Sequence, residues 1–241
     1  MNAKPILMHG HSIRSLMAGH KTQTRRIVKP QPPGDELGNT YSGQIFGPEM
    51  YSPVVVDRHG EEYPGPDIYG IYDEDGEWGV KCRYGQPGDL LYVRERHAIV
   101  PRTAYAQSMG VEQTLRPGDD HDAAIFQAGW DRSPPGRWRP SIHMPRWASR
   151  ITLHLTDVRV ERVQGISEDD AIDEGVEACF PNTDHEHSAR DRFRALWNFT
   201  NGAGAWDRNE WCWVLCFDVI QANVDDVIAD PSRYAIWEPT S

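Results

Sequence analysis

The sequence contains little that would support a disulfide framework or a structural zinc site. Only four cysteines occur in 241 residues, at positions 82, 179, 212 and 216, and none forms a Cys-x-x-Cys pair. We expect reduced, mostly buried thiols, as is usual in intracellular proteins. Two His-x-His pairs, His9 with His11 and His185 with His187, have no third ligand nearby. We interpret them as loop or capping histidines, and we expect neither a metal nor a cofactor.

Long apolar segments are also missing. No run approaches the roughly 20 residues that a membrane span needs. Residues 1–10 lack the apolar stretch and the small-residue cleavage site of a signal peptide. We therefore expect a soluble, cytoplasmic protein with no membrane partner. Hydrophobic residues make up 39% of the chain and nine tryptophans are present, which argues against disorder and suffices for one good core.

The net charge of −11 argues against a protein that coats DNA or RNA indiscriminately. The charges are unevenly distributed, however. Residues 1–33 contain six Lys or Arg and no acid, and residues 131–150 contain five Arg and one Asp, whereas residues 34–130 are strongly acidic. If the two basic segments meet in space, they form a local site for a nucleotide, a nucleoside or a short strand. The alternative is that each segment pairs with carboxylates nearby.

Hydrophobic periodicity predicts an α+β chain. The expected strands and helices, in order, are strand 5–7, helix 11–19, and strands 21–28, 90–93 and 151–163, followed by helices 167–175 and 190–198 and strand 211–220. A slip near Asp157 predicts a bulge, and Ser167 begins a capping box. Both faces of residues 211–220 are apolar, which favours a central strand.

This order of elements favours a small mixed β-barrel flanked by short helices. We expect a single domain over residues 1–222, with a C-terminal tail at 223–241. Residues 34–85 are rich in Gly and Pro and predict an insertion of small hairpins, and residues 101–136 predict a loop-like insertion. The acidic insertions offer a surface for a protein partner.

The most informative stretch runs from Gly19 to Arg26. A lysine follows a helix-ending glycine, and two threonines and two arginines come directly after it, so hydrogen-bond donors gather at one corner. On its own this pattern is also that of a solvated corner.

Residues 19–25, Gly-His-Lys-Thr-Gln-Thr-Arg, resemble the signature of the ASCH family, small β-barrel domains related to the PUA RNA-binding fold. Residues 87–95, 167–176 and 213–217 resemble, in order, that family's Gly-Asp turn and strand, its short helix and its closing strand. Segments 137–150 and 193–213 are similar to a larger branch found in phages and prophages. The resemblance implies a PUA-like barrel, located in the bacterial host cytoplasm if the protein is phage-encoded.

One branch of this family hydrolyses the acetyl amide of N4-acetylcytidine, and another has been described as cleaving single-stranded RNA. The resemblance implies catalytic roles for Lys21, Thr24 and Glu174. Thr24 would supply a hydroxyl nucleophile, activated by a neutral Lys21 or by Glu174. If the three form a working pocket, the Lys21 amine must lie within hydrogen-bond reach of the Glu174 carboxylate.

We expect the pocket to bind a nucleobase or single-stranded RNA. The alternatives are an amidohydrolase on N-acylated pyrimidine nucleosides, a ribonuclease, or a phage accessory or assembly protein that binds another protein. Further binding residues are expected in the basic segments, where arginines and a tryptophan combine phosphate contact with stacking. They are Arg25, Arg26, Glu95, Arg137, Arg139, Arg146, Trp147 and Arg150. Alternatively, the tryptophans are core residues, and Glu95 pairs with Arg94 or Arg96.

Overall fold

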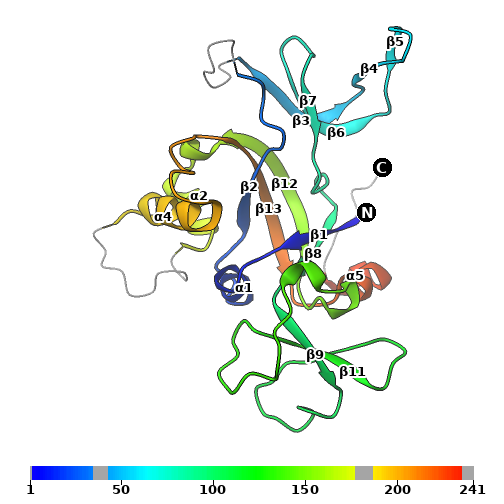
Figure 1. Ribbon diagram of the computed structural model, residues 1–241, viewed down its shortest axis with the longest axis vertical. Coiled ribbons are helices and arrows are strands. Elements are labelled where there is room, and N and C mark those ends of the chain that lie inside the picture. Colours follow the sequence, from blue (N-terminus) through cyan, green and yellow to red (C-terminus); the bar gives the residue numbers. More distant parts are fainter. Residues whose placement is uncertain (1, 35–42, 177–186, 235–241) are drawn as a thin grey trace.

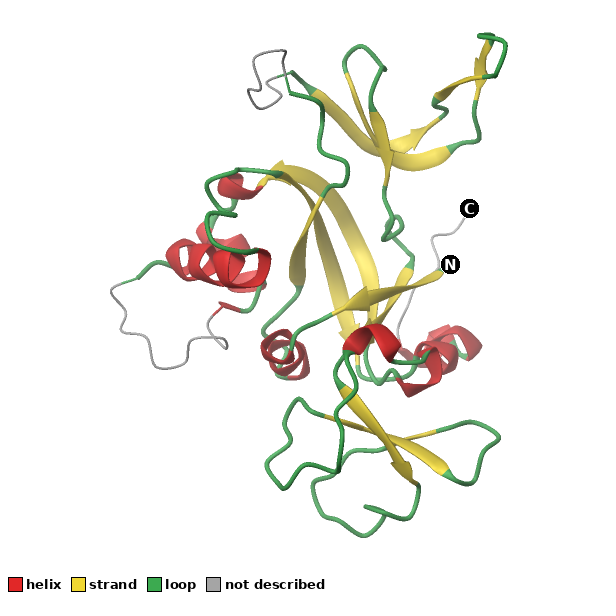
Figure 2. Ribbon diagram, in the orientation of Figure 1, coloured by secondary structure: helices red, strands yellow, loops and turns green. Residues whose placement is uncertain are grey.

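The computed structural model describes residues 2–34, 43–176 and 187–234. Within these ranges the protein is α+β, as predicted, with a five-stranded sheet at its centre (Figures 1 and 2). In spatial order the strands are β1 (Ala3–Leu7), β8 (Leu90–Arg94), β12 (Thr152–Arg162), β13 (Trp211–Ile220) and β2 (Gln23–Ile27). β1 runs parallel to β8, and the other neighbouring strands are antiparallel.

Two predictions about this sheet are confirmed. The register of β12 against β13 shifts between Leu155 and Asp157, which is the predicted bulge. β13 lies between β12 and β2, so it is a central strand. Its alternating side chains are buried on both faces because the core lies on one side and the helices lie on the other.

The sheet does not close into a barrel over the described residues; the sequence predicted a small mixed barrel and left open whether it closes. β1 and β2 are its two edges, and neither pairs with the other. Helix α1 (Gly10–Met17) connects them and buries Ile13 and Leu16 in the main core with residues of β8, β12 and β13. The chain thus covers the gap between the edge strands with a helix instead of hydrogen-bonding them to each other.

The other helices cover the flanks of the sheet. They are α2 (Glu168–Asp173), α4 (Ala189–Asn201) and α5 (Val224–Ala229), with short 3-10 turns at Ser141–His143, Arg146–Ala148, Val163–Gly165 and Pro231–Tyr234. Ser167 caps α2 as predicted, since its hydroxyl accepts a hydrogen bond from the Asp170 amide at 3.1 Å. α2 and α4 lie together beside β2 (Figure 1).

The expected tail is helical in its first part. Asn223 caps α5, and Val224 and Val227 pack on Leu90 and Ile220. The prediction of a tail failed here because only two apolar residues, three apart, provide the buried contact. Residues 235–241 lie outside the described residues.

Residues 43–85 and 97–126 form two small lobes at opposite ends of the central sheet (Figure 1). The first contains β3 (Ile45–Tyr51), β4 (Val54–Val56), β5 (Glu62–Pro64), β6 (Ile68–Asp73) and β7 (Gly79–Lys81). The second contains β9 (His97–Pro101), β10 (Thr114–Leu115) and β11 (Asp122–Phe126). The first agrees with the predicted hairpins. The second corrects a loop-like prediction, because Ala123, Ala124 and Ile125 are fully buried.

None of the described helices combines the length and the apolar character needed to cross a lipid bilayer.

Candidate functional site

A cavity of about 220 Å³ lies between the start of α1, strand β2 and helix α4. We call it the basic pocket, because its lining includes five cationic side chains and a single carboxylate. The cations are Lys21, Arg25, Arg26, Lys29 and Arg83, and the carboxylate belongs to Glu174. Aromatic rings of Tyr84, Phe193 and Trp197 complete much of the wall. The volume is below that of a pocket for a drug-sized molecule, so it suits a small group.

Lys21 and Glu174 meet inside this pocket. The Lys21 ammonium donates to Oε2 of Glu174 at 2.7 Å and to the Glu174 backbone carbonyl at 2.7 Å. The two side chains are only 3% and 5% exposed. The expected contact between amine and acid is therefore present. It also fastens the end of α2 to the start of β2, since Glu174 is the C-terminal cap of α2.

The second oxygen of Glu174 faces Arg25. Oε1 accepts the backbone N–H of Arg25 at 2.5 Å and lies 3.7 Å from its guanidinium Nη1. The fully buried guanidinium also reaches Glu161 and Asp170, each at 2.9 Å through Nη2. Burial would raise the pKa of Asp170, but the hydrogen bond and charge of Arg25 outweigh it and lower the pKa. The Nε and Nη1 groups of Arg25 are buried and have no hydrogen-bond acceptor among the described residues.

Three cations of the basic pocket have no carboxylate partner in the described part of the chain: Arg26, Lys29 and Arg83. Arg26 donates instead to the carbonyl of Leu7 at 2.8 Å. Burial lowers the pKa of Arg26; the charges of Tyr84 and Glu174 oppose this effect, and the positive charge of Arg83 adds to it. Like charges in a partly desolvated wall repel one another, so an anion bound between them is stabilised.

Two histidines stand at the start of α1 and line the same pocket. The rings of His9 and His11 stack with centroids 5.7 Å apart and planes 12° apart. Burial, followed by the charges of His9, Lys21 and Arg14, lowers the pKa of His11 to about 4. His11 is therefore neutral at pH 7. His9 is the N-cap residue of α1, yet its side chain makes no capping hydrogen bond. His185 lies outside the described residues.

Helix α4 supplies the aromatic wall. Phe193, Leu196, Trp197 and Thr200 recur at helical spacing on the face that lines the pocket. The rings of Phe193 and Trp197 lie 5.7 Å apart, and the Arg25 guanidinium carbon lies 5.9 Å from the Phe193 centroid. The indole N–H of Trp197 is buried without an acceptor among the described residues. This wall therefore offers an apolar face, with one unsatisfied donor buried in it.

Thr24 also lines the basic pocket, from strand β2 between Gln23 and Arg25. The structure thus brings together five of the predicted site residues, namely Lys21, Thr24, Arg25, Arg26 and Glu174.

Glu95 lies elsewhere. It is buried against Arg150, with oxygen–nitrogen distances of 2.9 and 3.1 Å, and not against Arg94 or Arg96. Burial raises the pKa of Glu95, and the hydrogen bond and charge of Arg150 oppose the rise. The Glu95 carboxylate does not lie near Lys21. Glu95 directly follows β8, which ends beside the second lobe, on the other side of α1 from the basic pocket.

The basic segment 131–150 contributes no residue to the basic pocket. Arg146 pairs with Asp225 of α5 at 2.7 Å, and Trp147 packs against a small core that contains Phe126 and Met144. Arg137 is exposed, and the backbone of Arg139 bridges to His97. Arg146 and Arg150 therefore pair with carboxylates, which was the alternative prediction. The two basic segments do not form one shared site in the basic pocket.

Several pocket residues were not singled out from the sequence. Arg83 and Tyr84 lie in the connection between β7 and β8, where nothing in the local pattern distinguishes them. Phe193 and Trp197 show a helical spacing that also fits an ordinary core face, and both are in fact largely buried. The His9-x-His11 alternation was visible in the sequence and was interpreted as a pair of loop or capping histidines; His9 is the N-cap residue, but its side chain makes no capping hydrogen bond.

No protein-family model, no curated protein and no solved structure matches this chain. Among the residues that the structure describes, no cluster of three or more His, Cys, Asp or Glu is arranged to hold a metal ion.

Proposed function

We propose that the basic pocket binds one nucleotide of single-stranded RNA, or a free nucleoside or nucleotide. The observation that carries this proposal is the combination of Arg26, Lys29 and Arg83, which lack carboxylate partners among the described residues, with an aromatic wall in one small cavity. Cations suit the phosphate, and aromatic faces suit the base. The combination is local, since the whole chain carries a net charge of −11.

Two residues of the pocket wall also carry donors that are shielded from solvent and lack acceptors among the described residues: Arg25, at Nε and Nη1, and Trp197, at its indole N–H. A buried donor without a partner is costly, so a ring nitrogen or carbonyl oxygen of a pyrimidine that enters as these side chains shift would stabilise them. Glu174 uses one lone pair on each oxygen and can still accept from an exocyclic amino group.

The order of the motifs supports a relation to the ASCH family and to the PUA-like fold. In this proposal the central sheet is an open version of that barrel, with α1 between its edge strands and Lys21 at the exit from the helix. The two lobes are then additions to the minimal domain.

A second candidate function is hydrolysis of an N-acylated pyrimidine nucleoside. It is favoured by the presence of Lys21, Thr24 and Glu174 in one cavity. Glu174 would accept a proton from Thr24 as its oxygen bonds to the acyl carbon. The Lys21 ammonium would give a proton to the leaving amine, and water would then release the acyl group from Thr24 as a carboxylic acid. The close contact with Glu174 favours the ammonium form of Lys21, so Glu174 serves as the base in this scheme.

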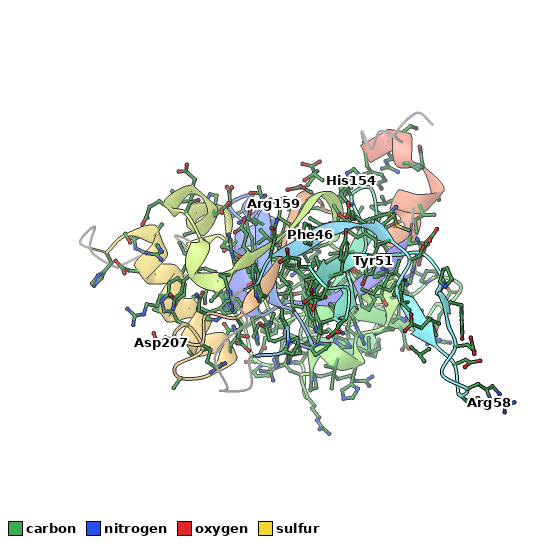
Figure 3. The ribbon with its side chains drawn as sticks, turned by 90° about the horizontal axis from the view of Figure 1, so that it is seen from above. Phe46, Tyr51, Arg58, His154, Arg159 and Asp207 are labelled. Carbon is green, nitrogen blue, oxygen red and sulfur yellow. The ribbon has the colours of Figure 1, made fainter. Side chains whose placement is uncertain are left out.

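A calorimetric titration of the protein with cytidine monophosphate tests the binding proposal. We expect saturable binding, and a loss of about tenfold or more in Arg26→Gln and in Arg83→Gln, because each removes a charged contact. Arg58→Gln is the matched control, since Arg58 is an exposed arginine in the hairpin of β4 and β5, far from the body of the protein (Figure 3). Absence of binding to nucleosides, nucleotides and short RNA alike overturns the proposal.

Mass spectrometry of N4-acetylcytidine after incubation tests the second candidate. Turnover that disappears in Lys21→Ala supports it, and equal, negligible turnover in both proteins removes it. Recovery of intact single-stranded RNA from the same incubation removes a ribonuclease activity. A stable protein partner captured through the acidic lobes, without nucleic acid, would instead favour the accessory-protein alternative.

A further inference from the structure

Two more hollows continue from the basic pocket around the N-terminal end of α1. The first, of about 420 Å³, shares Met8 and His9 with the basic pocket, and we call it the middle hollow. The second, of about 390 Å³, shares Arg14 and Ala128 with the middle hollow, and we call it the far hollow. Neighbouring hollows share wall residues, so the three adjoin one another along α1, from α4 to the lobe of β9, β10 and β11, and we call this row of hollows the groove.

The middle hollow is positively charged. Arg14 and Arg96 line it, both are exposed, and neither pairs with a described carboxylate. Its one acid, Glu95, is already neutralised by Arg150. The N-terminus of α1 begins here at Gly10, with no acidic residue in its first turn. The helix dipole and the two arginines therefore favour a phosphate group in this hollow.

The far hollow offers a surface for stacking. Trp130 lines it half-exposed, and the Arg150 guanidinium carbon lies 4.1 Å from the centroid of the Phe126 ring. The Arg150 side chain is only 9% exposed and pairs with Glu95 and Glu112, so the half-exposed indole of Trp130 is the surface on which a base can stack. Ile13 and Met17 of α1 complete an apolar wall opposite.

We infer that the ligand is a single strand of RNA and not a free nucleoside, with successive nucleotides in the basic pocket, the middle hollow and the far hollow. This inference rests on the proposed function, because the first nucleotide occupies the basic pocket. The far hollow is built partly from residues 110–112 and 126–130. The second lobe therefore forms one wall of the strand's binding site.

The dependence of affinity on strand length tests the inference. Fluorescence titrations use cytidine 5′-monophosphate and 5′-phosphorylated oligocytidylates of two, three and four nucleotides, so that each step adds one phosphate. We expect affinity to rise at each step up to three nucleotides and then to level off. The slope of log K against log salt should steepen by about 0.7 for each added phosphate. Equal affinity for the monophosphate and the trinucleotide overturns the inference.

Charge-removing variants locate the strand. Arg14→Gln and Arg96→Gln should each weaken the trinucleotide about tenfold and reduce the salt slope by about 0.7, while binding of the monophosphate stays within twofold. Arg58→Gln, on the distant hairpin, should change neither. If Arg14→Gln and Arg96→Gln match the wild type on the trinucleotide, the strand does not follow this groove and the inference fails.

Failure of the proposed function and failure of this inference give different results in these titrations. Loss of monophosphate binding itself defeats the proposed function, whereas unchanged monophosphate binding without a length dependence defeats only the extended groove. A trinucleotide that lacks its bases provides the last comparison. It should bind at least tenfold more weakly than the complete strand, since stacking contributes to affinity. Equal binding would indicate a polyanion site without base recognition and would overturn the inference.

Discussion

The Lys21 ammonium and the Glu174 carboxylate both lose their hydration on folding, so the pairing between them dominates the energetics of the basic pocket. A buried ion pair gains little over an apolar pair, but removal of one partner leaves a charge without compensation. Arg25 also contacts Glu174, through its backbone N–H and its guanidinium. Loss of Lys21 therefore leaves Glu174 partly compensated, whereas loss of the Glu174 carboxylate removes the negative charge that faces the Lys21 ammonium at 2.7 Å.

A double-mutant cycle measures this coupling. Lys21→Met should lower the free energy of unfolding by about 3 kcal/mol, and Glu174→Gln by more, about 5 kcal/mol, because it removes the carboxylate that faces the buried Lys21 ammonium. The double variant should be more stable than the sum of the two losses predicts, with a coupling of at least about 1 kcal/mol. Urea denaturation of the four proteins gives the values. Strict additivity would contradict a coupled pair, and the binding assay on the folded double variant separates stability from function.

His11 gives the site a pH dependence whose sign is fixed by its environment. Its pKa is lowered from 6.5 to about 4, so the folded, empty protein resists protonation of this ring. The contribution of the neutral ring to stability is present above pH 6.5 and is lost as the pH falls toward 4. A bound phosphodiester offsets the repulsion from His9, Lys21 and Arg14 and raises this pKa. Binding therefore takes up a proton.

The affinity for the dinucleotide CpC should accordingly increase as the pH is lowered from 7 to 5. This ligand is chosen because its only phosphate is a diester, which does not titrate in that range. In His11→Gln the same titration should show a flatter profile, and His154→Gln, a histidine on β12 outside the pocket, serves as the control. Parallel profiles for wild type and His11→Gln would exclude this residue as the proton acceptor.

At the scale of elements, the end of α2 is held against α1 and β2 by a glycine. Gly175 has a φ of +78°, and a Cβ at this position would lie 2.8 Å from the Ser15 Cβ and 3.1 Å from the Lys21 Cβ. Gly19 has a similar φ of +72° but has no atom within 4 Å of an added Cβ. The two positions share backbone strain and differ in packing.

Gly175→Ala should therefore destabilise the protein more than Gly19→Ala. The left-handed conformation costs about 1–2 kcal/mol in both variants, and the contacts at Gly175 add to it. Thermal unfolding of the two variants gives the difference, and nucleotide titration should show weaker binding only in Gly175→Ala, because Lys21 is displaced there. Equal losses of stability in the two variants would show that α2 moves without disturbing Lys21.

The sequence predicted elements with a distinctive apolar pattern, including the short strands β1 and β8, and missed short elements without one. The bulge in β12 and the central place of β13 follow from apolar residues over ten or more positions. β11 has only Ala123, Ala124, Ile125 and Phe126 to mark it, and its burial depends on contacts with β9 and Trp147 that are remote in sequence. The site shows the same limit. Lys21 and Glu174 stood out through their motifs, whereas Arg83 reaches the pocket only because β8 places its preceding loop there.

At the scale of the whole molecule, the acidic chain restricts where a nucleic acid can lie. Among the described residues, the first lobe carries most of its carboxylates without arginine partners, whereas the basic pocket and the middle hollow contain five cations without carboxylate partners: Arg26, Lys29, Arg83, Arg14 and Arg96. A long polyanion that strays from the groove meets repulsion over roughly a Debye length, about 8–10 Å at physiological salt. The electrostatic field of the protein therefore favours a short contact with a flexible single strand over a contact with a long polyanion.

Duplex RNA should consequently bind far more weakly than a single strand of the same sequence. A paired base cannot enter a cavity of about 220 Å³ behind α4, and the stiff backbone of a duplex cannot bend to follow the groove, so its phosphates stay outside the pocket. Competition against a labelled trinucleotide measures the ratio, which we expect to exceed about a hundredfold, and a strand with a single unpaired end should recover most of the affinity. Equal competition by blunt duplex would mean that the cations recognise the phosphate backbone from outside, with no base inside the pocket.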